Sequence, residues 1–258
     1  MRDKDLERLR DLRLFSGMAA ERFQDLTSTA LLQKFPAATT LLFEGDTVDF
    51  LYVLLDGAVE MQGVWNDKET AIAIVRPLSV FILSSVVLDA PALMSARTLE
   101  RSEILMLPAE GVRRAMRADG AFSLAIAEEM AGWNRALVRQ VKNIKLRSGA
   151  ERLANYLLQL QVQQNGVTTV RLLHEKRILA SVLGMTPENL SRAFAALADY
   201  GVEVHGNEVS LTRGVALTRM AKPSPFIDNH MPPLDHLGGK AEREQWPPND
   251  LGGKVIFD

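Results

Sequence analysis

The sequence predicts an α+β chain in which a barrel or jelly roll of short strands precedes one long helix and a small mixed domain. Three observations lead to this prediction. Short apolar runs separated by tight turns fill residues 35–107, an unbroken helical pattern covers residues 122–147, and two short helices joined by a glycine turn cover residues 175–197. Many short strands at even spacing are typical of a β-roll.

The chain is predicted to begin with helices. Leu6, Leu9 and Leu12 recur at three-residue spacing among charges, which indicates an amphipathic helix over residues 3–14, and a second helix is expected to begin at Ser16. The N-terminus is charged throughout and does not resemble a signal peptide. No apolar run approaches the roughly 20 residues that a membrane span needs, so we expect a soluble, cytoplasmic protein.

Tight turns in the strand region predict three hairpins, one of which joins strands over residues 58–64 and 70–75 through a turn at Asn66-Asp67-Lys68. Asp56-Gly57 is a strong two-residue hairpin signal because both residues tolerate positive φ, so the strands on either side are expected to pair. The third hairpin is expected between residues 93–100 and 103–107.

The long helix, about residues 122–147, carries an apolar seam that indicates a parallel dimer. At 1.5 Å per residue it would span roughly 40 Å. Asn134 lies within the seam, as asparagine does in coiled coils whose register it fixes. A helix packed on its own barrel is the alternative for half of the seam. The expected interface consists of Met130, Asn134, Leu137, Val141 and Ile144.

Beyond the long helix the pattern predicts a winged helix. Ser148 and Glu151 match a capping box, so a new helix is expected to begin there. A strand, two helices and a hairpin around His205-Gly206-Asn207 follow. The expected units are a β-roll sensor domain over 1–120, a dimerisation helix over 121–147, a winged helix-turn-helix over 148–222, and a Pro/Gly-rich tail over 223–258 that we expect to be disordered.

The paired helices at residues 175–197 have clear start and stop signals. Gly184 ends the first helix, and Thr186-Pro187 begins the second with an N-cap hydroxyl and a proline at the first helical position. Two helices of this size form a helix-turn-helix, in which the second helix enters the DNA major groove. The alternative is an ordinary helical hairpin whose charges are solvated.

Composition narrows the function classes. Residues 145–222 hold ten Lys and Arg against six Asp and Glu, although the whole chain has a net charge of −2, which fits one DNA-facing domain. The chain has no cysteine, which excludes disulfides and thiolate-bound metals or iron–sulfur clusters. No nucleophile–base pair, metal-ligand cluster or phosphate-binding glycine loop is evident, so an enzyme is disfavoured.

The order of these units resembles the cyclic-AMP receptor protein and fumarate–nitrate regulator family, Crp/Fnr. The resemblance covers about residues 12–220 and is strongest in FEGDTVDFLYVLLDGAVEM and LASVLGMTPENLSRAFAAL. It implies a cyclic-nucleotide-binding-like β-roll and a homodimeric transcription regulator, more often an activator, that contacts double-stranded DNA and RNA polymerase. A sensory module whose winged helix binds another protein is the alternative.

Within the second helix, three residues match the family's E-x-x-S-R pattern: Glu188, Ser191 and Arg192. Arginine can contact a guanine edge with two hydrogen bonds, and glutamate can accept from a cytosine amino group. In the fumarate–nitrate branch this trio reads a TTGAT-like half-site, so we expect a similar palindrome. The expected DNA contacts are Glu188, Ser191, Arg192, Asn189, Lys176, Arg177 and Thr186.

The resemblance also implies a nucleotide site, but its key residues differ here. Ser84 and Met94 stand where the family's cyclic-AMP site has a glutamate and an arginine, so a phosphate would be buried without a cation. Cyclic AMP is therefore not the expected ligand. The pocket residues would be Phe81, Leu83, Ser84, Val86, Met94, Ser95 and Leu137.

Two hypotheses for control remain open at this point. A small apolar effector enters the β-roll, or the side chains of the roll fill its interior and protein abundance sets activity. No cofactor is expected. Met61, Met94 and Met106 could in principle reach a haem iron, but methionine among apolar strands is usually core.

Overall fold

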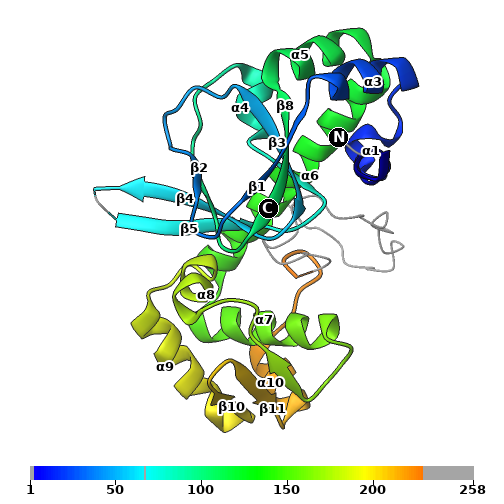
Figure 1. Ribbon diagram of the computed structural model, residues 1–258. Helices are drawn as coiled ribbons and strands as arrows, with labels where there is room; N and C mark the ends of the chain where they lie inside the picture. The colour runs from blue at the N-terminus through cyan, green and yellow to red at the C-terminus, as the bar shows by residue number, and fades with distance from the viewer. Residues whose placement is uncertain (1–2, 67, 229–258) are drawn as a thin grey trace, which may run out of the picture.

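The computed structural model describes residues 3–66 and 68–228, which form two parts with separate hydrophobic cores. A β-roll with its flanking helices forms the first part, and a small helical domain with a three-stranded sheet forms the second (Figure 1). The long helix α6 (Gly120–Leu146) runs from the roll towards the second part. This arrangement confirms the predicted fold class.

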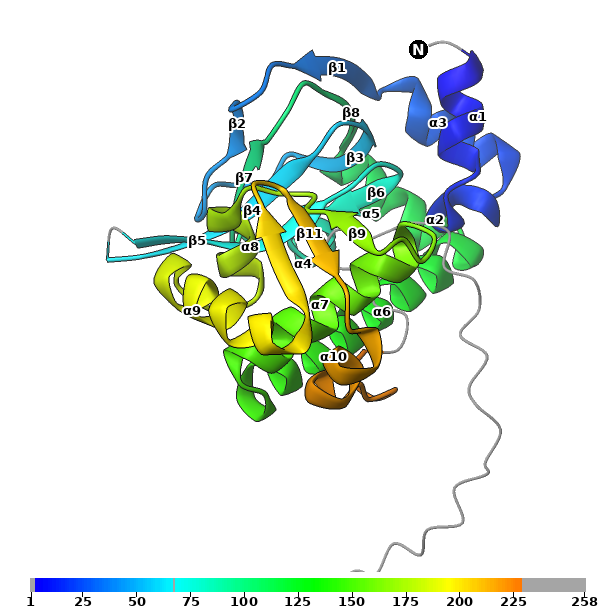
Figure 2. The same ribbon diagram turned by 90° about the horizontal axis from the view of Figure 1, so that it is seen from below.

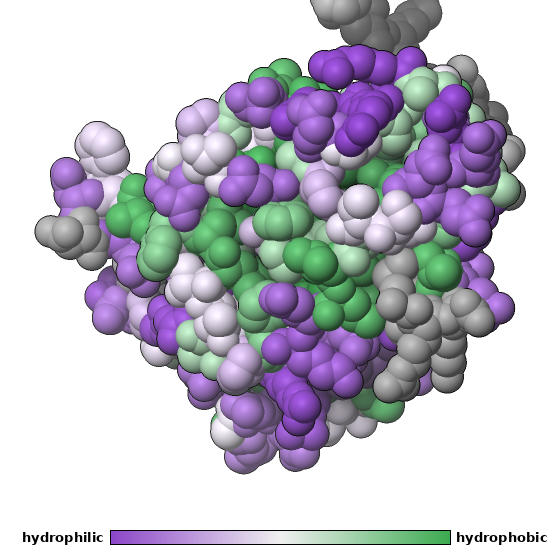
Figure 3. All heavy atoms as spheres, turned by 45° about the horizontal axis from the view of Figure 1, so that its top comes forward, coloured by the Kyte–Doolittle hydropathy of each residue, from purple (hydrophilic) through white to green (hydrophobic). Residues whose placement is uncertain are grey.

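Two four-stranded antiparallel sheets build the roll. The first sheet has the order β1 (Leu31–Phe35), β8 (Ser102–Pro108), β3 (Phe50–Asp56), β6 (Ser79–Phe81), and the second has β2 (Thr40–Leu42), β7 (Ser95–Thr98), β4 (Val59–Trp65), β5 (Lys68–Val75). The β4–β5 hairpin extends from the body of the roll (Figures 1 and 2). Hydrophobic residues gather between hydrophilic ones on the face shown in Figure 3.

The expected hairpin between residues 58–64 and 70–75 is confirmed as β4–β5, and the other two expected hairpins were wrong. The strands on either side of Asp56-Gly57 lie in different sheets, and so do β7 and β8. The two sheet-to-sheet crossings lie against each other, since the Leu99 N–H donates to the Ala58 carbonyl over 2.8 Å. Gly57 has φ +95°, and a Cβ there would come within 2.3 Å of Ser102 Oγ. The glycine is needed for this close approach rather than for a hairpin turn.

The first N-terminal helix begins at Asp3 as predicted, but its end and the start of the following helices differ from the prediction. The helices are α1 (Asp3–Arg10), α2 (Arg13–Ser16) and α3 (Ala20–Ser28), so the chain breaks near residue 11 and Ser16 ends a helix. Phe15 is buried and stacks on Phe122 of α6, with 5.8 Å between ring centroids. The separate helix α2 thus places Phe15 against α6.

Asp119 joins the N-terminal helices to α6. Its carboxylate accepts from the Phe122 N–H at 3.0 Å, as the N-cap of α6, and from the Ala19 N–H at 2.9 Å. These backbone hydrogen bonds hold the pKa of Asp119 below its usual value. Before it, α4 (Leu83–Leu88) and α5 (Ala109–Ala118) cover one end of the roll.

The second part is a winged helix, as predicted. Its elements are α7 (Gly149–Gln163), β9 (Thr169–Arg171), α8 (Lys176–Val182), α9 (Pro187–Leu197), the 3₁₀ turn η1 (Ala198–Tyr200), β10 (Val202–His205), β11 (Glu208–Leu211) and α10 (Gly214–Ala221). The predicted capping box between Ser148 and Glu151 is present with both of its hydrogen bonds. Gly206 turns the wing with φ +63°.

The tail was only partly predicted. Residues 223–228, which we expected to be disordered, are folded against α6 and α7. The remainder of the predicted tail, residues 229–258, lies outside the described residues.

Candidate nucleic-acid interface

The turn between α8 and α9 has the geometry of a helix-turn-helix. Gly184 adopts φ +64°, which permits the sharp reversal after α8. The Thr186 hydroxyl then caps α9 by accepting from the Asn189 N–H at 3.3 Å, and Pro187 occupies the first turn. Both features confirm the expected start of the second helix.

Helix α9 has one buried and one exposed face. Its buried residues, Leu190, Ala193, Phe194 and Leu197, belong to the core of the winged domain. Glu188, Asn189, Ser191 and Arg192 are all exposed. Glu188 and Arg192 are separated by one helical turn, so they present an acceptor and a donor on the same side. The anchored face fixes α9, and the open face is free to enter a groove.

Local contacts determine the charge state and hydrogen bonding of the exposed side chains of α9. The Thr186 hydroxyl, the backbone N–H of Glu188 itself and Arg192 hold the pKa of Glu188 below its usual value, so this carboxyl stays ionised as an acceptor. The Ser191 hydroxyl donates to the Pro187 carbonyl at 3.1 Å. Thr186 therefore acts as a cap rather than as a free contact residue.

The two basic residues expected to contact DNA from α8 have other neighbours. Lys176 Nζ lies 5.9 Å from the centre of the Phe194 ring, between α8 and α9. Arg177 lies near enough to Glu60 of β4 for its positive charge to oppose the rise in the pKa of that buried carboxyl. Arg177 is therefore exposed to solvent and also interacts electrostatically with a residue of the roll.

Helix α8 also docks on the roll, a contact that sequence reasoning missed. Ile178 and Val182 are buried in the core of the roll rather than in that of the winged domain. Gln140 of α6 donates to the Val182 carbonyl at 3.0 Å, and Arg76 lies 3.2 Å from His174 Nε2. Figures 1 and 2 both place α8 beside the β4–β5 hairpin. The helix thus belongs to two cores at once.

A buried carboxylate lies on the β4 strand near this contact. Glu60 is 2% exposed and accepts from Gln62 Nε2 at 2.9 Å. Burial raises the pKa of Glu60, although Arg177 of α8 and Arg97 of β7 oppose the rise and Glu69 of β5 adds to it. An acid surrounded by apolar residues in the β4 sequence was the available signal for this site.

We expect Glu60→Gln to stabilise the protein at neutral pH. Because the pKa of Glu60 is higher in the folded than in the unfolded chain, its contribution to stability is greatest below the unfolded pKa near 4.5 and is lost as pH rises through the folded pKa. The amide removes this loss, so the variant should be more stable than the wild type at pH 7 and equal to it near pH 4. Urea unfolding at both pH values, with Glu203→Gln, an exposed glutamate of the winged domain, as the control, tests this. A variant less stable than the wild type at pH 7 would contradict it.

Helix α6 exposes an apolar stripe along its length. We use the term α6 stripe for exposed residues spaced alternately by three and four: Leu124, Ala127, Ala131, Asn134, Val138 and Val141. Of the expected interface residues, Met130 instead packs against the core of the roll, and Ile144 lies beside Gly184. Leu137 is 54% exposed and borders the stripe. The 3–4 spacing is that of a coiled-coil seam.

The residues expected to line an effector pocket differ in burial: four are buried and three are partly or fully exposed. Phe81, Leu83 and Val86 are fully buried core residues, and Phe81 stacks on Tyr52 with 5.1 Å between ring centroids. Ser95 accepts from the Glu44 N–H at 2.9 Å.

The other three expected pocket residues are more open. Ser84 and Met94 are half-buried at the edge of the roll, and Leu137 is on the exposed side of α6. Met94 and Met106 pack against the core in which Met61 is buried. Within the described part of the chain, no group of three or more His, Asp or Glu residues is placed to hold a metal ion, and no helix is long and apolar enough to cross a membrane.

Comparison with known proteins identifies both parts. A model of the cyclic nucleotide-binding domain matches residues 32–119, and a model of the Crp-like helix-turn-helix domain matches residues 151–220. The chain belongs to the Crp/Fnr family. Members of this family are transcription regulators rather than enzymes, and the Crp-like domain of this chain is a DNA-binding domain.

Individual Crp/Fnr relatives match nearly their whole length. The global nitrogen regulator of a Nostoc species is 24% identical over 80% of this chain and 94% of its own. A CRP-like cAMP-activated global transcriptional regulator of Mycobacterium tuberculosis is 23% identical over 81% and 96%. The solved structure of FixK2 from Bradyrhizobium japonicum has a TM-score of 0.64 and 20% identity over 76% and 99%, which supports the fold.

Proposed function

We propose that this Crp/Fnr protein is a homodimer that binds a TTGAT-like palindrome in double-stranded DNA and activates transcription through RNA polymerase. The observation that carries the proposal is the exposed trio on α9, Glu188, Ser191 and Arg192, on a helix whose other face is anchored in the domain core. Arg192 would contact a guanine edge with two hydrogen bonds, and Glu188 would accept from a cytosine amino group.

Dimerisation is proposed from the α6 stripe. Its exposed apolar residues follow the 3–4 spacing of a coiled-coil seam, and Asn134 lies at its middle. Two copies related by a two-fold axis would present two α9 helices, which matches the symmetry of a palindrome.

We propose that the β-roll core does not hold a cyclic nucleotide. Ser84 and Met94 offer no cation or carboxylate for the phosphate and ribose of such a ligand. Of the two hypotheses for control, the close packing of Phe81 on Tyr52 supports an interior filled by its own side chains over one that admits a small apolar effector.

Binding to a TTGAT-like palindrome at graded salt tests the function. Because phosphate contacts release counterions, the affinity should fall by about 10³-fold or more between roughly 50 and 200 mM salt, with a scrambled duplex binding more weakly throughout. A winged helix that serves a protein partner would bind neither duplex at low salt, and that result would overturn the proposal.

A further inference from the structure

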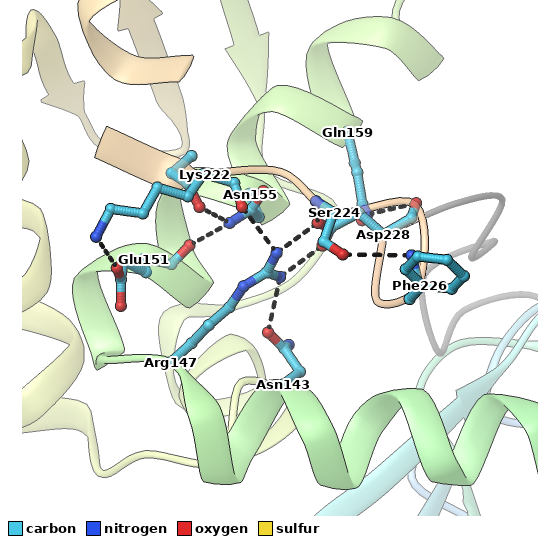
Figure 4. Close-up of polar contacts among 10 residues, drawn as sticks. Asn143, Arg147, Glu151, Asn155, Gln159, Lys222, Ser224, Phe226 and Asp228 are labelled. Carbon is cyan, nitrogen blue, oxygen red and sulfur yellow. Dashed lines mark hydrogen bonds and ion pairs between the residues drawn. The ribbon is translucent and has the colours of Figure 1, made fainter. Parts of the chain in front are cut away.

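The chain turns back on itself after the winged domain. Lys222 ends α10 in the left-handed conformation, with φ +47°, and the following residues run to the junction between α6 and α7. Ser224 and Asp228 close this segment, since the Ser224 N–H donates to Asp228 Oδ2 at 2.6 Å and the Asp228 N–H donates to the Ser224 carbonyl at 2.7 Å. We call residues 222–228 the hinge strap (Figure 4). The Crp-like domain model ends at residue 220, so the strap lies outside the matched part.

A buried ion pair holds the end of the hinge strap. Arg147 donates from Nη1 to Asp228 Oδ1 at 2.6 Å and from Nη2 to Oδ2 at 2.5 Å. The two side chains are 7% and 15% exposed. Arg147 also donates to Asn143 Oδ1 at 3.2 Å and to the Lys222 carbonyl at 3.3 Å. Two parallel hydrogen bonds fix the relative orientation of both planar groups, so this contact is directional as well as strong.

The hinge is the junction between α6 and α7 at Arg147 and Ser148, and the hinge strap contacts both of these helices. Arg147 is the C-cap of α6, and the next residue is the N-cap of α7. On the α7 side, Gln159 Nε2 donates to the Asp228 carbonyl at 3.3 Å, and Lys222 Nζ lies 3.1 Å from Glu151 Oε1. Figure 4 shows the strap side chains between α6 below and α7 above.

The strap also reaches the contact between α6 and the helix-turn-helix. Ile227 and Asp228 line a small cavity of about 40 Å³ together with Gln140 of α6 and Val182 and Leu183 at the end of α8.

The hinge itself needs such support. Arg147 and Ser148 are both extended, with ψ of 145° and 161°, and so no helical hydrogen bond joins α6 to α7. Arg152 of α7 holds one side of the junction by donating to the Ile144, Arg147 and Gly184 carbonyls. The strap also holds the junction, through the contact of Asp228 with Arg147. Removing the strap would leave Arg152 and the docking of α8 on the roll as the supports of the angle between α6 and α9.

We propose that the hinge strap clamps the winged domain to α6 at one angle, and that the Arg147–Asp228 pair thereby sets the half-site spacing that the dimer accepts. The spacing role rests on the proposed dimeric DNA binding. In a dimer joined through α6, the angle at each hinge determines the distance between the two α9 helices. Half-site spacing is a direct consequence of that distance.

The test uses Asp228→Asn in the full chain, with Asp25→Asn as a control that removes a charge from an exposed pair elsewhere. Because the chain has no cysteine, spin labels can be placed at Gln33→Cys in the roll and Glu203→Cys in the winged domain. The label-to-label distance distribution should be narrow in the wild type and the control and broad in Asp228→Asn. Arg147→Lys, which keeps the charge but loses the two-pronged contact, should also broaden it and serves if Asp228→Asn fails to fold. An unchanged distribution in the folded variants would overturn the clamp.

Palindromes whose half-sites are moved apart by one or two base pairs provide the second readout. The preference for the best spacing should fall about tenfold in Asp228→Asn and stay unchanged in Asp25→Asn. A broadened distance distribution with unchanged spacing preference would overturn the spacing role. If the wild type binds no DNA, the proposed function fails, while the distance measurement still decides whether the strap is a clamp.

Discussion

Replacing both Val138 and Val141 with aspartate is expected to convert the protein to monomers. The two valines are 49% and 50% exposed in the single chain and form the C-terminal end of the α6 stripe. In a coiled coil each aspartate would be buried opposite a like charge, at an effective cost of several kcal/mol per ion. Light scattering at micromolar concentration should then give one chain where the wild type gives two.

Loss of the dimer should also abolish tight DNA binding. Two linked winged domains bind a palindrome with an avidity that exceeds single-site binding by about 10² or more, so the double variant should lose at least that factor in affinity. Val162→Asp provides the matched control, because Val162 of α7 is 77% exposed and lies outside the stripe. A variant that remains dimeric would show that the α6 stripe is not the interface.

Arg192→Ala is expected to remove sequence preference at one guanine in each half-site. A side chain that donates twice to a guanine edge contributes about 1–3 kcal/mol of discrimination between bases. The variant should therefore lose about 1–3 kcal/mol of binding free energy per half-site, and only for duplexes with the matched sequence. Competition between the palindrome and duplexes changed at single positions measures this. The loss should concentrate at the guanine positions.

Two further variants separate base reading from general charge. Arg192→Lys keeps the positive charge but not the forked donor, so it should retain non-specific binding and lose most of the guanine preference. Arg219→Ala removes an exposed positive charge from α10 of the same domain and should leave the preference intact. Equal preference in Arg192→Ala and the wild type would exclude a base-reading role.

The winged helix could be predicted because its signals are local. Gly184, Thr186 and Pro187 each specify backbone geometry within one or two residues, and the capping box at Ser148 works in the same way. These positions confirmed the predicted elements. Exposure of Glu188, Ser191 and Arg192 followed from the helical period once the start of α9 was known.

The two hairpins expected at Asp56-Gly57 and between β7 and β8 were wrong because local signals do not determine which sheet a strand joins. Asp56-Gly57 has the composition of a two-residue hairpin, but strand pairing depends on which sheet each strand joins. The decisive contact, between the Leu99 N–H and the Ala58 carbonyl, joins residues 41 apart in the chain. The glycine that suggested the turn is needed instead to let the two crossings approach.

The hinge strap and the docking of α8 were missed for the same reason. Arg147 and Asp228 are 81 residues apart, and nothing in their immediate neighbours predicts the pair. Disorder was predicted from the proline and glycine content of residues 223–258 as a whole, although residues 223–228 contain no glycine. Similarly, Ile178 and Val182 have the spacing of any apolar helix face, and only the structure shows that they enter the core of the roll.

Counting the chains bound to one DNA duplex tests the central proposal most directly. A labelled TTGAT-like palindrome is titrated with the protein above its dissociation constant, beside a duplex in which one half-site is scrambled. The proposal predicts two chains per intact palindrome and an affinity for the half-scrambled duplex that is lower by about 10²-fold or more. One chain per palindrome, or equal affinity for the two duplexes, would contradict it.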